Sequence, residues 1–341
     1  MVSNWFFVYY RQLQMRRSYR SNVVAVVVTY QPKLGVLGQL LDALTSQVKS
    51  IVLVDNGSQV DLEAWNTQRQ SSAVEVLLLG ENQGIAVAHN VGIRWAQNNA
   101  AEFVLLMDQD SIPAPDMVQM LIFTLLEVEN KSDFKPIAAG PICVDMRNAE
   151  KSIFVTERNG IPARYHPVIP ISHDSSSVEV VSLISSGTLI NLKALWNVGG
   201  MRSNYFIDHV DTEWCFRARA KGYSLLGVPG AQMQHTLGDK VRNFWFFGWK
   251  QVAYHSPLRD YYMFRNTLLM CRDVEMSVMW RLHLIFRLVK FSSYFLTFTP
   301  QRGQRFHCMT LGIAHGLRGI SGKLDLKTGH CTQIPKSDLD P

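Results

Sequence analysis

Apolar residues in the first third of the chain occur in short, unbroken runs that alternate with segments of helical spacing. The runs predict strands buried on both faces, and they cover residues 23–30, 51–54, 74–79 and 103–107. The intervening segments place apolar or small residues three and four positions apart, which predicts helices at about 34–48 and 85–98. Strands that alternate with helices in this way form βαβ units. We therefore predict an α/β fold with a mostly parallel central sheet flanked by helices.

The pattern is looser after residue 115. Helices are predicted at about 116–129 and 211–221, and a strand at about 137–144. Gly222 lies where a helix C-cap is expected. Acidic residues near the start of the 211–221 helix would suit its positive end even without a catalytic role.

Polar side chains follow several predicted strands at the point where each one ends. Asp108 and Asp110 follow the fourth run, Asp55 follows the second, and Asn82 comes shortly after the third. Ligands in open α/β sheets bind beyond the carboxyl ends of the strands. The sequence therefore favours a nucleotide-sized binding site at this edge of the sheet.

Two carboxylates one residue apart repel each other unless a positive charge lies between them. A hard divalent cation with oxygen ligands satisfies Asp108 and Asp110 most simply. The alternative is a strand end followed by a solvated turn. The glycine-rich loops of dinucleotide oxidoreductases and P-loop NTPases are absent from the sequence, which disfavours both classes. A phosphate group held without such a loop usually needs a metal ion.

Composition and charge narrow the class of protein further. The chain has 341 residues, 47% of them hydrophobic and 18% charged, which describes a globular protein. Between residues 242 and 305, ten Lys and Arg residues face three acids, a balance suited to nucleic acid, an anionic membrane or phosphate-bearing substrates. Five scattered cysteines without a Cys-x-x-Cys pair favour neither a disulfide framework nor a zinc site, and indicate a reducing cytoplasm.

Six short motifs occur along the chain in a fixed order. They are Val-Val-Val-Thr-Tyr (26–30), Val-Asp-Asn-Gly-Ser (54–58), Asn-Gln-Gly-Ile-Ala-Val-Ala-His-Asn-Val-Gly (82–92), Leu-Met-Asp-Gln-Asp-Ser (106–111), Ser-Ser-Gly-Thr-Leu-Ile (185–190) and Phe-Ile-Asp-His-Val-Asp-Thr-Glu-Trp (206–214). Over residues 22–266, this order and spacing resembles the family 2 glycosyltransferases of the GT-A fold, most closely their bacterial rhamnosyltransferase branch. The resemblance implies a GT-A fold and transfer of a sugar from a nucleotide-sugar donor.

The resemblance implies roles for residues that would bind the donor. Asp55 matches the acid that hydrogen-bonds the pyrimidine base, and Thr29 and Tyr30 would line the same pocket. Asn82 and Gly84 match the loop that closes over the nucleotide.

The same resemblance implies a metal site and a general base. Asp110 would hold Mg²⁺ or Mn²⁺ against the diphosphate, and Asp108 would bind the ribose or the metal. Asp211 lies where the family keeps its base, in a motif that is usually Glu-Asp-x-Asp. Here Val210 and Glu213 replace the first Glu and the last Asp, so Asp211, Glu213 and Asp208 all remain candidates for the base.

Three further residues match positions that could contact the diphosphate or the metal. His235 lies at the position of a His-x-x-Gly motif that can approach the metal, although a lone histidine is as often structural. Arg259 and Arg265 belong to an Arg-x-x-Tyr-x-x-Arg-Asn stretch whose cations could contact the diphosphate or a lipid phosphate. Solvated or snorkelling arginines are the alternative.

The expected reaction is an inverting single displacement. One base and no enzyme nucleophile are needed to move a glycosyl group from a nucleoside diphosphate to an alcohol. The branch resemblance implies dTDP-L-rhamnose as the donor and a growing polysaccharide or lipid-linked glycan as the acceptor. Another hexose from a UDP- or dTDP-sugar is the near alternative. A haloacid-dehalogenase-type phosphatase is remote, because three βα units precede the Asp-x-Asp motif, and a non-catalytic relative would have lost the carboxylates.

Residues 276–299 are apolar and aromatic but are interrupted by Arg281, Arg287 and Lys290. This pattern favours a helix in the membrane interface rather than a spanning helix, or else a helix packed on the catalytic domain or a second subunit. We expect a cytoplasmic protein, peripheral on the inner membrane, without a nucleic acid partner and with possible oligomerisation through C-terminal helices. The expected organisation is a basic, aromatic leader (1–21), a catalytic domain (22–240, with a nucleotide-binding half, 22–115, and an acceptor half, 116–240) and a helical C-terminal region (241–341).

Overall fold

The computed structural model describes most of the chain. The described residues are 23–69, 73–131, 134–145, 150–167, 177–235, 240–245, 249–325, 327–334 and 339–340. The expected leader, residues 1–21, lies outside the described residues.

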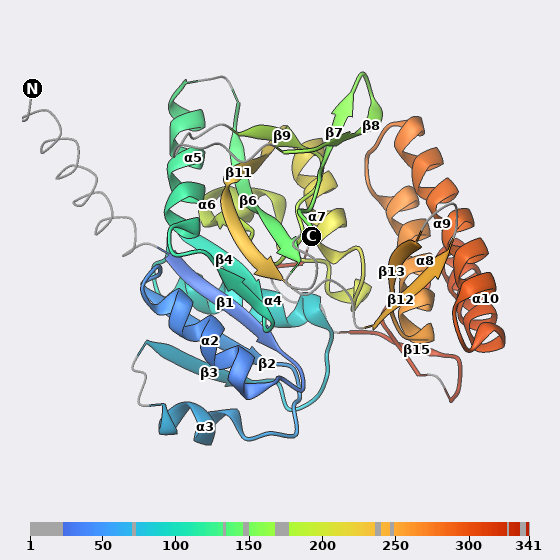
Figure 1. The fold of residues 1–341 in the computed structure, drawn as a ribbon, viewed down its shortest axis with the longest axis horizontal. Helices are drawn as coiled ribbons and strands as arrows, with labels where there is room; N and C mark the ends of the chain where they lie inside the picture. The colour runs from blue at the N-terminus through green and yellow to red at the C-terminus, as the bar shows by residue number, and fades with distance from the viewer. Residues whose placement is uncertain are drawn as a thin grey trace, which may run out of the picture.

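A nine-stranded sheet forms the centre of the molecule (Figure 1). Its order along the main path is β3 (Val74–Leu78), β2 (Ser50–Asp55), β1 (Val23–Thr29), β4 (Phe103–Asp108), β10 (Leu189–Asn191), β6 (Pro136–Asp145), β11 (Ser224–His235) and β5 (Ser111–Pro113), and β9 (Val178–Val180) pairs with β11. The first four strands run parallel, β10 runs antiparallel to β4 and β6, and β11 runs parallel to β6. The predicted α/β fold with a central sheet flanked by helices is therefore confirmed. The sheet is mixed rather than mostly parallel, because the pairings of β10, β5 and β9 are antiparallel.

Strand β1 shows why the sheet is buried on both faces. All seven of its residues are buried, and alternate side chains point to opposite layers. Val24, Val26 and Val28 belong to one core cluster, which also contains side chains of α4 (Ile85–Asn98), α6 (Leu192–Val198) and α7 (Val210–Ala220). Val23, Ala25 and Val27 belong to the other cluster, with α2 (Leu34–Thr45) and α5 (Met117–Lys131).

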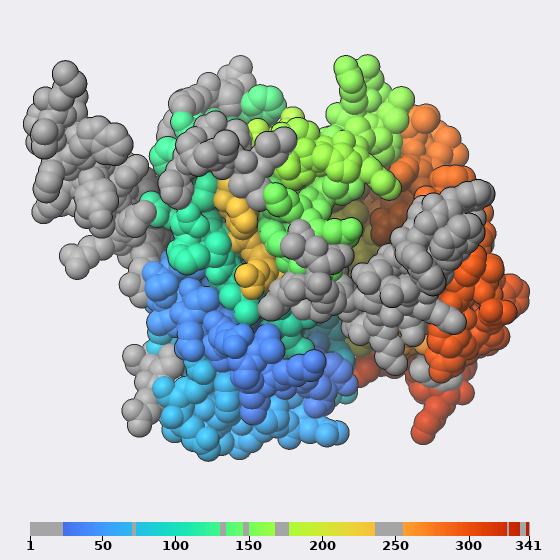
Figure 2. All heavy atoms as spheres, in the orientation of Figure 1, coloured from blue at the N-terminus to red at the C-terminus, as the bar shows by residue number. Residues whose placement is uncertain are grey.

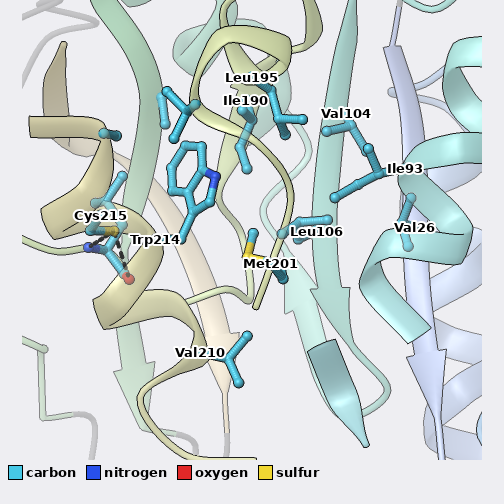
Figure 3. Packing of buried hydrophobic residues seen from close by; sticks show 14 of the residues in the cluster. Val26, Ile93, Val104, Leu106, Ile190, Leu195, Met201, Val210, Trp214 and Cys215 are labelled. Atoms are coloured by element: carbon cyan, nitrogen blue, oxygen red, sulfur yellow. Dashed lines mark hydrogen bonds between the residues drawn. The ribbon is translucent and has the colours of Figure 1, made fainter. Parts of the chain in front are cut away.

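Helices α4 and α7 pack on the same face of the sheet. Figure 3 shows Trp214 of α7 beside Met201 and Ile190, with Ile93 of α4 close to Val26 and Leu106. Gly92 of α4 lies against the Val26 side chain, where a Cβ would clash. The small residues of this helix therefore permit the close approach to the sheet.

The remaining elements lie at the periphery and in the C-terminal region. Helix α3 (Leu62–Gln68) and the hairpin β7 (Phe154–Arg158)–β8 (Ile161–Tyr165) flank the central sheet, and the short helix η1 spans Ser203–Tyr205. After the hairpin β12 (Lys240–Trp245)–β13 (Trp249–Tyr254), the chain forms α8 (Pro257–Asp273), α9 (Val278–Phe298), α10 (Arg302–Arg318) and a small hairpin, β14 (Lys323–Leu324) with β15 (Cys331–Thr332). Helices α8, α9 and α10 lie together at one side of the molecule (Figure 1), and their orange atoms cover that side in Figure 2, so the predicted helical extension is present.

Buried contacts hold the C-terminal region together and join it to the preceding part of the chain. Within this region, Arg305 of α10 and Asp260 of α8 form an ion pair at 2.5 Å, with both side chains almost fully buried. Leu339 is buried in the same core cluster as Val26, and the neighbouring Asp340 carboxylate accepts a hydrogen bond from the Ser203 hydroxyl at 2.8 Å. No helix among the described residues is long and apolar enough to cross a membrane.

Candidate active site

The carboxyl end of β2 brings together the residues expected to bind a nucleotide base. The Asp55 carboxylate is buried and accepts hydrogen bonds from the Thr29 hydroxyl (2.9 Å) and the Ser58 backbone N–H (2.8 Å). Tyr30 follows Thr29, and its ring is about half exposed (48%). The Gln109 side-chain amide bonds both the N–H and the carbonyl of Tyr30, which fixes this residue between β1 and the end of β4.

The loop after β3 is ordered by two amide side chains, one of its own and one from the turn after β2. Asn82 Oδ1 accepts from the Gly84 N–H (3.0 Å), and Asn56 Oδ1 accepts from the Gln83 N–H (2.8 Å). Gly84 has φ of +93°, and a Cβ there would lie 2.6 Å from the Phe206 carbonyl oxygen. Glycine is therefore required both by the backbone conformation and by the contact with Phe206.

Asp108, Asp110 and His235 offer three ligand atoms that lie within 4.8 Å of one another. Asp108 ends β4, Asp110 lies in the turn between β4 and β5, and His235 ends β11, which pairs with β5. Two carboxylate oxygens and one imidazole nitrogen suit Mg²⁺ or Mn²⁺. Asp110 is about half exposed (48%), so this group is open to a ligand from outside.

A chain of hydroxyl groups holds this cluster in place. The Ser186 hydroxyl accepts from the Asp108 backbone N–H (3.0 Å) and lies 2.7 Å from the Ser111 hydroxyl. The Ser111 hydroxyl in turn lies 2.8 Å from Nδ1 of His235. Hydrogen bonds behind a metal ligand fix its orientation, so Ser111 and Ser186 support the fit of this site to a cation.

The electrostatics of Asp108 show which charged groups surround it. The pKa of Asp108 is raised to about 6, mainly by burial, and the negative charges of Asp110 and Asp211 contribute to this increase. The charges of His235 and Arg259 act in the opposite direction. These five groups, contributed by β4, β11, α7 and α8 and the turn after β4, therefore share one electrostatic environment.

Asp211 lies in the first turn of α7, where the positive end of the helix favours a carboxylate. Its oxygens accept hydrogen bonds from the backbone N–H groups of Thr212 (2.6 Å) and Ser185 (3.3 Å). Burial is the largest effect on its pKa, which is raised above the ordinary value. Ser185 adjoins Ser186, so one short segment connects Asp211 with the backbone of Asp108.

The other two candidates for the base are engaged by arginines. Glu213 is fully buried, and its two oxygens lie 2.9 Å from Nε and Nη2 of Arg217, with Arg202 bonded to the same carboxylate. Asp208 forms a two-point contact with Arg259, at 2.6 and 3.2 Å. A base must reach the acceptor hydroxyl, so the geometry of Glu213 favours a structural role for this side chain.

The two arginines expected near the diphosphate differ in their surroundings. Arg259 is part-exposed and bonds Asp208 in the electrostatic neighbourhood of Asp108. Arg265 is fully buried, and its guanidinium donates to the carbonyls of Gly322 (2.6 Å) and Tyr205 (3.0 Å) and to Asn266 Oδ1 (2.9 Å). Arg265 therefore fits a structural role, and a contact with the diphosphate does not agree with its burial.

Two features of the site were missed in the sequence. Ser111 and Ser186 lie 75 positions apart in the sequence. They meet because β5, which begins at Ser111, lies at the edge of the sheet beside β11, close to the segment before β10. Arg287 of α9 is exposed and lies within electrostatic range of Asp211 and Asp208. The serine pair had a signal in the sequence, because each serine belongs to one of the six motifs, whereas Arg287 had none.

Comparison with known proteins shows the family of this chain. Residues 24–132 match the sequence profile of Glycosyl transferase family 2. Over 304 residues, the chain is 31% identical to the dTDP-rhamnosyl transferase RfbF of Shigella flexneri, and the match covers 89% of this chain and 97% of the relative. The chain therefore belongs to the family 2 glycosyl transferases. It is an enzyme of this class, and the predicted resemblance to the bacterial rhamnosyltransferase branch is confirmed.

More distant relatives share the fold. The low-salt glycan biosynthesis hexosyltransferase Agl10 of Haloferax volcanii is 19% identical over 274 residues, 78% of this chain and 81% of the relative. The structure of residues 1–349 of S. aureus TarS superposes with a TM-score of 0.52 at 14% identity, covering 86% of this chain and 80% of TarS 1–349. GalNAc-T7, solved with UDP, GalNAc and Mn²⁺, gives the same TM-score and identity over 81% of this chain, which spans just over half (56%) of the GalNAc-T7 chain. The GT-A fold expected from the sequence is therefore confirmed.

Proposed function

We propose that this enzyme transfers L-rhamnose from dTDP-L-rhamnose to a glycan by a single inverting displacement that depends on a divalent cation. The observation that supports this most directly is that Asp211 shares one electrostatic environment with the Asp108–Asp110–His235 cluster. A base and a site for a cation must lie close together, because the attacked sugar carbon lies between the acceptor hydroxyl and the departing diphosphate.

The donor would be held by residues from the ends of three parallel strands. Asp55 is already oriented by Thr29 and Ser58, and its carboxylate would accept a hydrogen bond from the ring N–H of thymine or uracil. Gly84 and its loop would close over the nucleotide. Asp108, Asp110 and His235 would hold Mg²⁺ or Mn²⁺, which neutralises charge on the leaving diphosphate when bound.

We assign the general base to Asp211. Its two rival carboxylates already bond arginines, whereas the hydrogen bonds that Asp211 accepts within the described part of the chain come from backbone N–H groups and a hydroxyl. A carboxylate whose pKa is raised by burial is a stronger base. Asp211 would take the proton of the acceptor hydroxyl as that oxygen attacks the anomeric carbon, and the bond to the diphosphate oxygen would break on the opposite side.

The donor sugar is proposed from the relative with the higher identity, the dTDP-rhamnosyl transferase RfbF. A uridine donor is the alternative, because TarS 1–349 has been solved with UDP-GlcNAc. Thymine and uracil offer Asp55 the same ring N–H, so Asp55 cannot distinguish them. The choice between donors therefore requires a binding experiment.

The first experiment measures donor binding to the purified protein by calorimetry. We expect dTDP-rhamnose to bind more tightly than UDP-glucose, UDP-galactose and GDP-mannose, and only with Mg²⁺ or Mn²⁺ present. In the Asp110→Ala variant, the cation should no longer strengthen donor binding. The control is Asp42→Ala, which removes a carboxylate on α2 that is 74% exposed, and its donor binding should depend on the cation as in wild type. Cation-dependent preference for a UDP-hexose would replace the proposed donor, and absence of any cation-dependent binding would refute the proposed mechanism.

The outer face of α9 supports a peripheral position on an anionic membrane, on its cytoplasmic side, where a lipid-linked acceptor would be presented. Trp280, Leu284 and Leu288 of α9 face the protein and are buried. Seven apolar side chains on other sides of the helix are exposed, namely Val278, Met279, Leu282, Ile285, Phe286, Val289 and Phe298. Arg281 and Lys290 are also exposed on this helix, which suits anionic headgroups.

The membrane proposal is tested by sedimentation with phosphatidylglycerol vesicles and with neutral phosphatidylcholine vesicles. We expect binding to the anionic vesicles, weakened about 100-fold by Leu282→Ser with Phe286→Ser because two apolar side chains no longer leave water. Phe123→Ser on α5, which is exposed to a similar degree (46%), is the matched control. Equal binding of all three proteins would refute this position of α9.

A further inference from the structure

The segment that leads into α7 has a strained backbone. Phe206, Asp208 and His209 have φ values of +65°, +62° and +61°, although none of them is glycine. Side chains with a Cβ rarely adopt this left-handed region, and such residues persist only where their surroundings fix them. Three such residues within four positions therefore require specific contacts that hold the backbone in this conformation.

That support comes from Asn266 of α8. Its Nδ2 lies within hydrogen-bond distance of three carbonyl oxygens of the strained segment, those of Tyr205 (3.0 Å), Ile207 (2.8 Å) and Asp208 (2.9 Å). Asn266 is fully buried. Its Oδ1 accepts a hydrogen bond from Nε of Arg265 at 2.9 Å. Because a guanidinium group cannot accept a hydrogen bond, the atom facing Arg265 must be the amide oxygen, and Nδ2 faces the carbonyls.

The two neighbours of Asn266 hold the same segment. Arg265 donates to the carbonyls of Asn204 (3.3 Å) and Tyr205 (3.0 Å). The Thr267 hydroxyl donates to the Met263 carbonyl (2.7 Å), so it accepts a hydrogen bond from Nε2 of His209, at 3.0 Å. Three consecutive buried residues of α8 thus form hydrogen bonds with residues 204–209.

The strained segment connects both halves of the candidate active site. On the donor side, the Phe206 carbonyl accepts from the Ile85 N–H (2.8 Å), directly after Gly84. On the acceptor side, the His209 carbonyl accepts from the Glu213 N–H (2.9 Å) and so begins the helix that carries Asp211. A change in residues 206–209 would therefore move the proposed base relative to the donor.

We propose that Asn266 is a positioning residue for sugar transfer, which acts by fixing the left-handed backbone of residues 206–209 and thereby the place of Asp211. This inference rests on the proposed function and deepens it. Asn266 touches no substrate in this assignment, and it acts through backbone carbonyls alone. The side-chain amide is required because an aspartate or a leucine of similar size offers no donor to three carbonyl oxygens.

The test compares Asn266→Asp with wild type at saturating donor and acceptor. A displacement of about 1 Å can cost about 100-fold in rate, so we expect kcat to fall by about that factor while the Kd for dTDP with Mg²⁺ changes by less than about threefold. Amide hydrogen exchange should accelerate at Ile85 and Glu213, whose N–H groups bond the segment. Asn197→Asp, at an exposed amide that bonds only the Tyr223 hydroxyl among the described residues, should leave all three measurements unchanged.

A second pair of variants tests the proposal even if Asn266→Asp does not fold. Thr267→Val removes the hydroxyl that accepts from His209, and Thr267→Ser restores it, so kcat should fall in the first and recover in the second. Unchanged kcat and unchanged exchange at Ile85 and Glu213 in folded Asn266→Asp would overturn the proposal. So would equal activities of the two Thr267 variants. A wild-type enzyme that transfers no sugar from any nucleotide donor would instead refute the proposed function, and the exchange measurement would still decide the role of Asn266.

Discussion

His89 is a histidine whose burial predicts a measurable loss of stability in acid. It lies on α4, its side chain is fully buried, and neither ring nitrogen has a hydrogen-bond partner in the part of the chain that the structure describes. A charged imidazolium in this environment would be strongly unfavourable. We therefore expect the substitution His89→Leu to change how the stability depends on pH.

The magnitude follows from the pKa. Burial lowers the pKa of His89 from 6.5 to about 4. Between these two values, the unfolded chain binds a proton that the native protein does not, so the free energy of unfolding decreases as the pH falls. The contribution of His89 is intact above pH 6.5, and lowering the pH to 4.5 removes about 2.5 kcal/mol of it.

Urea denaturation of wild type and His89→Leu at pH 8 and pH 4.5 measures this effect. The measured quantity is the difference in free energy of unfolding between the two proteins at each pH. Burial raises the pKa values of Asp108 and Asp260 to about 6, so these groups change the stability in the opposite direction. Both groups are present in both proteins, and their effect cancels in the difference. We expect the variant to gain about 2.5 kcal/mol relative to wild type between the two pH values.

The matched control is His307→Leu on α10, where the side chain is exposed in the native protein and remains in water on unfolding. This control should show no comparable change in its difference from wild type. If the difference in free energy of unfolding between His89→Leu and wild type is the same at both pH values, the reasoning is refuted. That result would mean that His89 binds its proton equally well in the native and the unfolded protein.

Three further predictions concern the candidate active site. Asp211→Asn should reduce kcat by about 10²–10⁴-fold while dTDP binding by calorimetry is retained, and a near-normal kcat would exclude Asp211 as the base. Gly84→Ala should lower the thermal midpoint and donor affinity, because its Cβ meets the Phe206 carbonyl at a φ of +93°; wild-type values would contradict this. Ser111→Ala should weaken Mn²⁺ binding about 10–100-fold, since it removes the hydroxyl bonded to His235, and unchanged titration by electron paramagnetic resonance would contradict that role.

Most of the central fold could be predicted because its signals are local. The uninterrupted run at 23–30 became β1, which is buried on both faces, and the helical spacing at 85–98 became α4 with the same bounds. Parallel order followed from the alternation of strands and helices. The antiparallel strand β10 was not predicted, because only three of its residues pair and nothing in so short a segment defines its direction.

The candidate site could be predicted only as far as single positions show their chemistry. Asp108 and Asp110 were recognisable from their spacing, and His235 from the resemblance to the family. The bond between Ser111 and Ser186 and the enclosure of Glu213 depend on contacts between distant segments, which spacing does not encode. Arg265 illustrates the limit most clearly, because an arginine next to a binding motif looks the same in sequence whether it faces a phosphate or donates to buried carbonyls.

The structure also explains why the C-terminal region matters for a site built mainly from the first 240 residues. Tyr262 of α8 stacks on Phe206 with ring centres 5.0 Å apart, and its hydroxyl accepts from the Leu324 N–H at 2.8 Å. The next residue back, Lys323, donates to the Asn82 carbonyl at 2.7 Å. The nucleotide loop is therefore held from two sides by the same region, directly by Lys323 and indirectly through Phe206. Because α8 also bonds the segment before Asp211, the C-terminal region contacts both the loop that contains Asn82 and the segment that leads into α7.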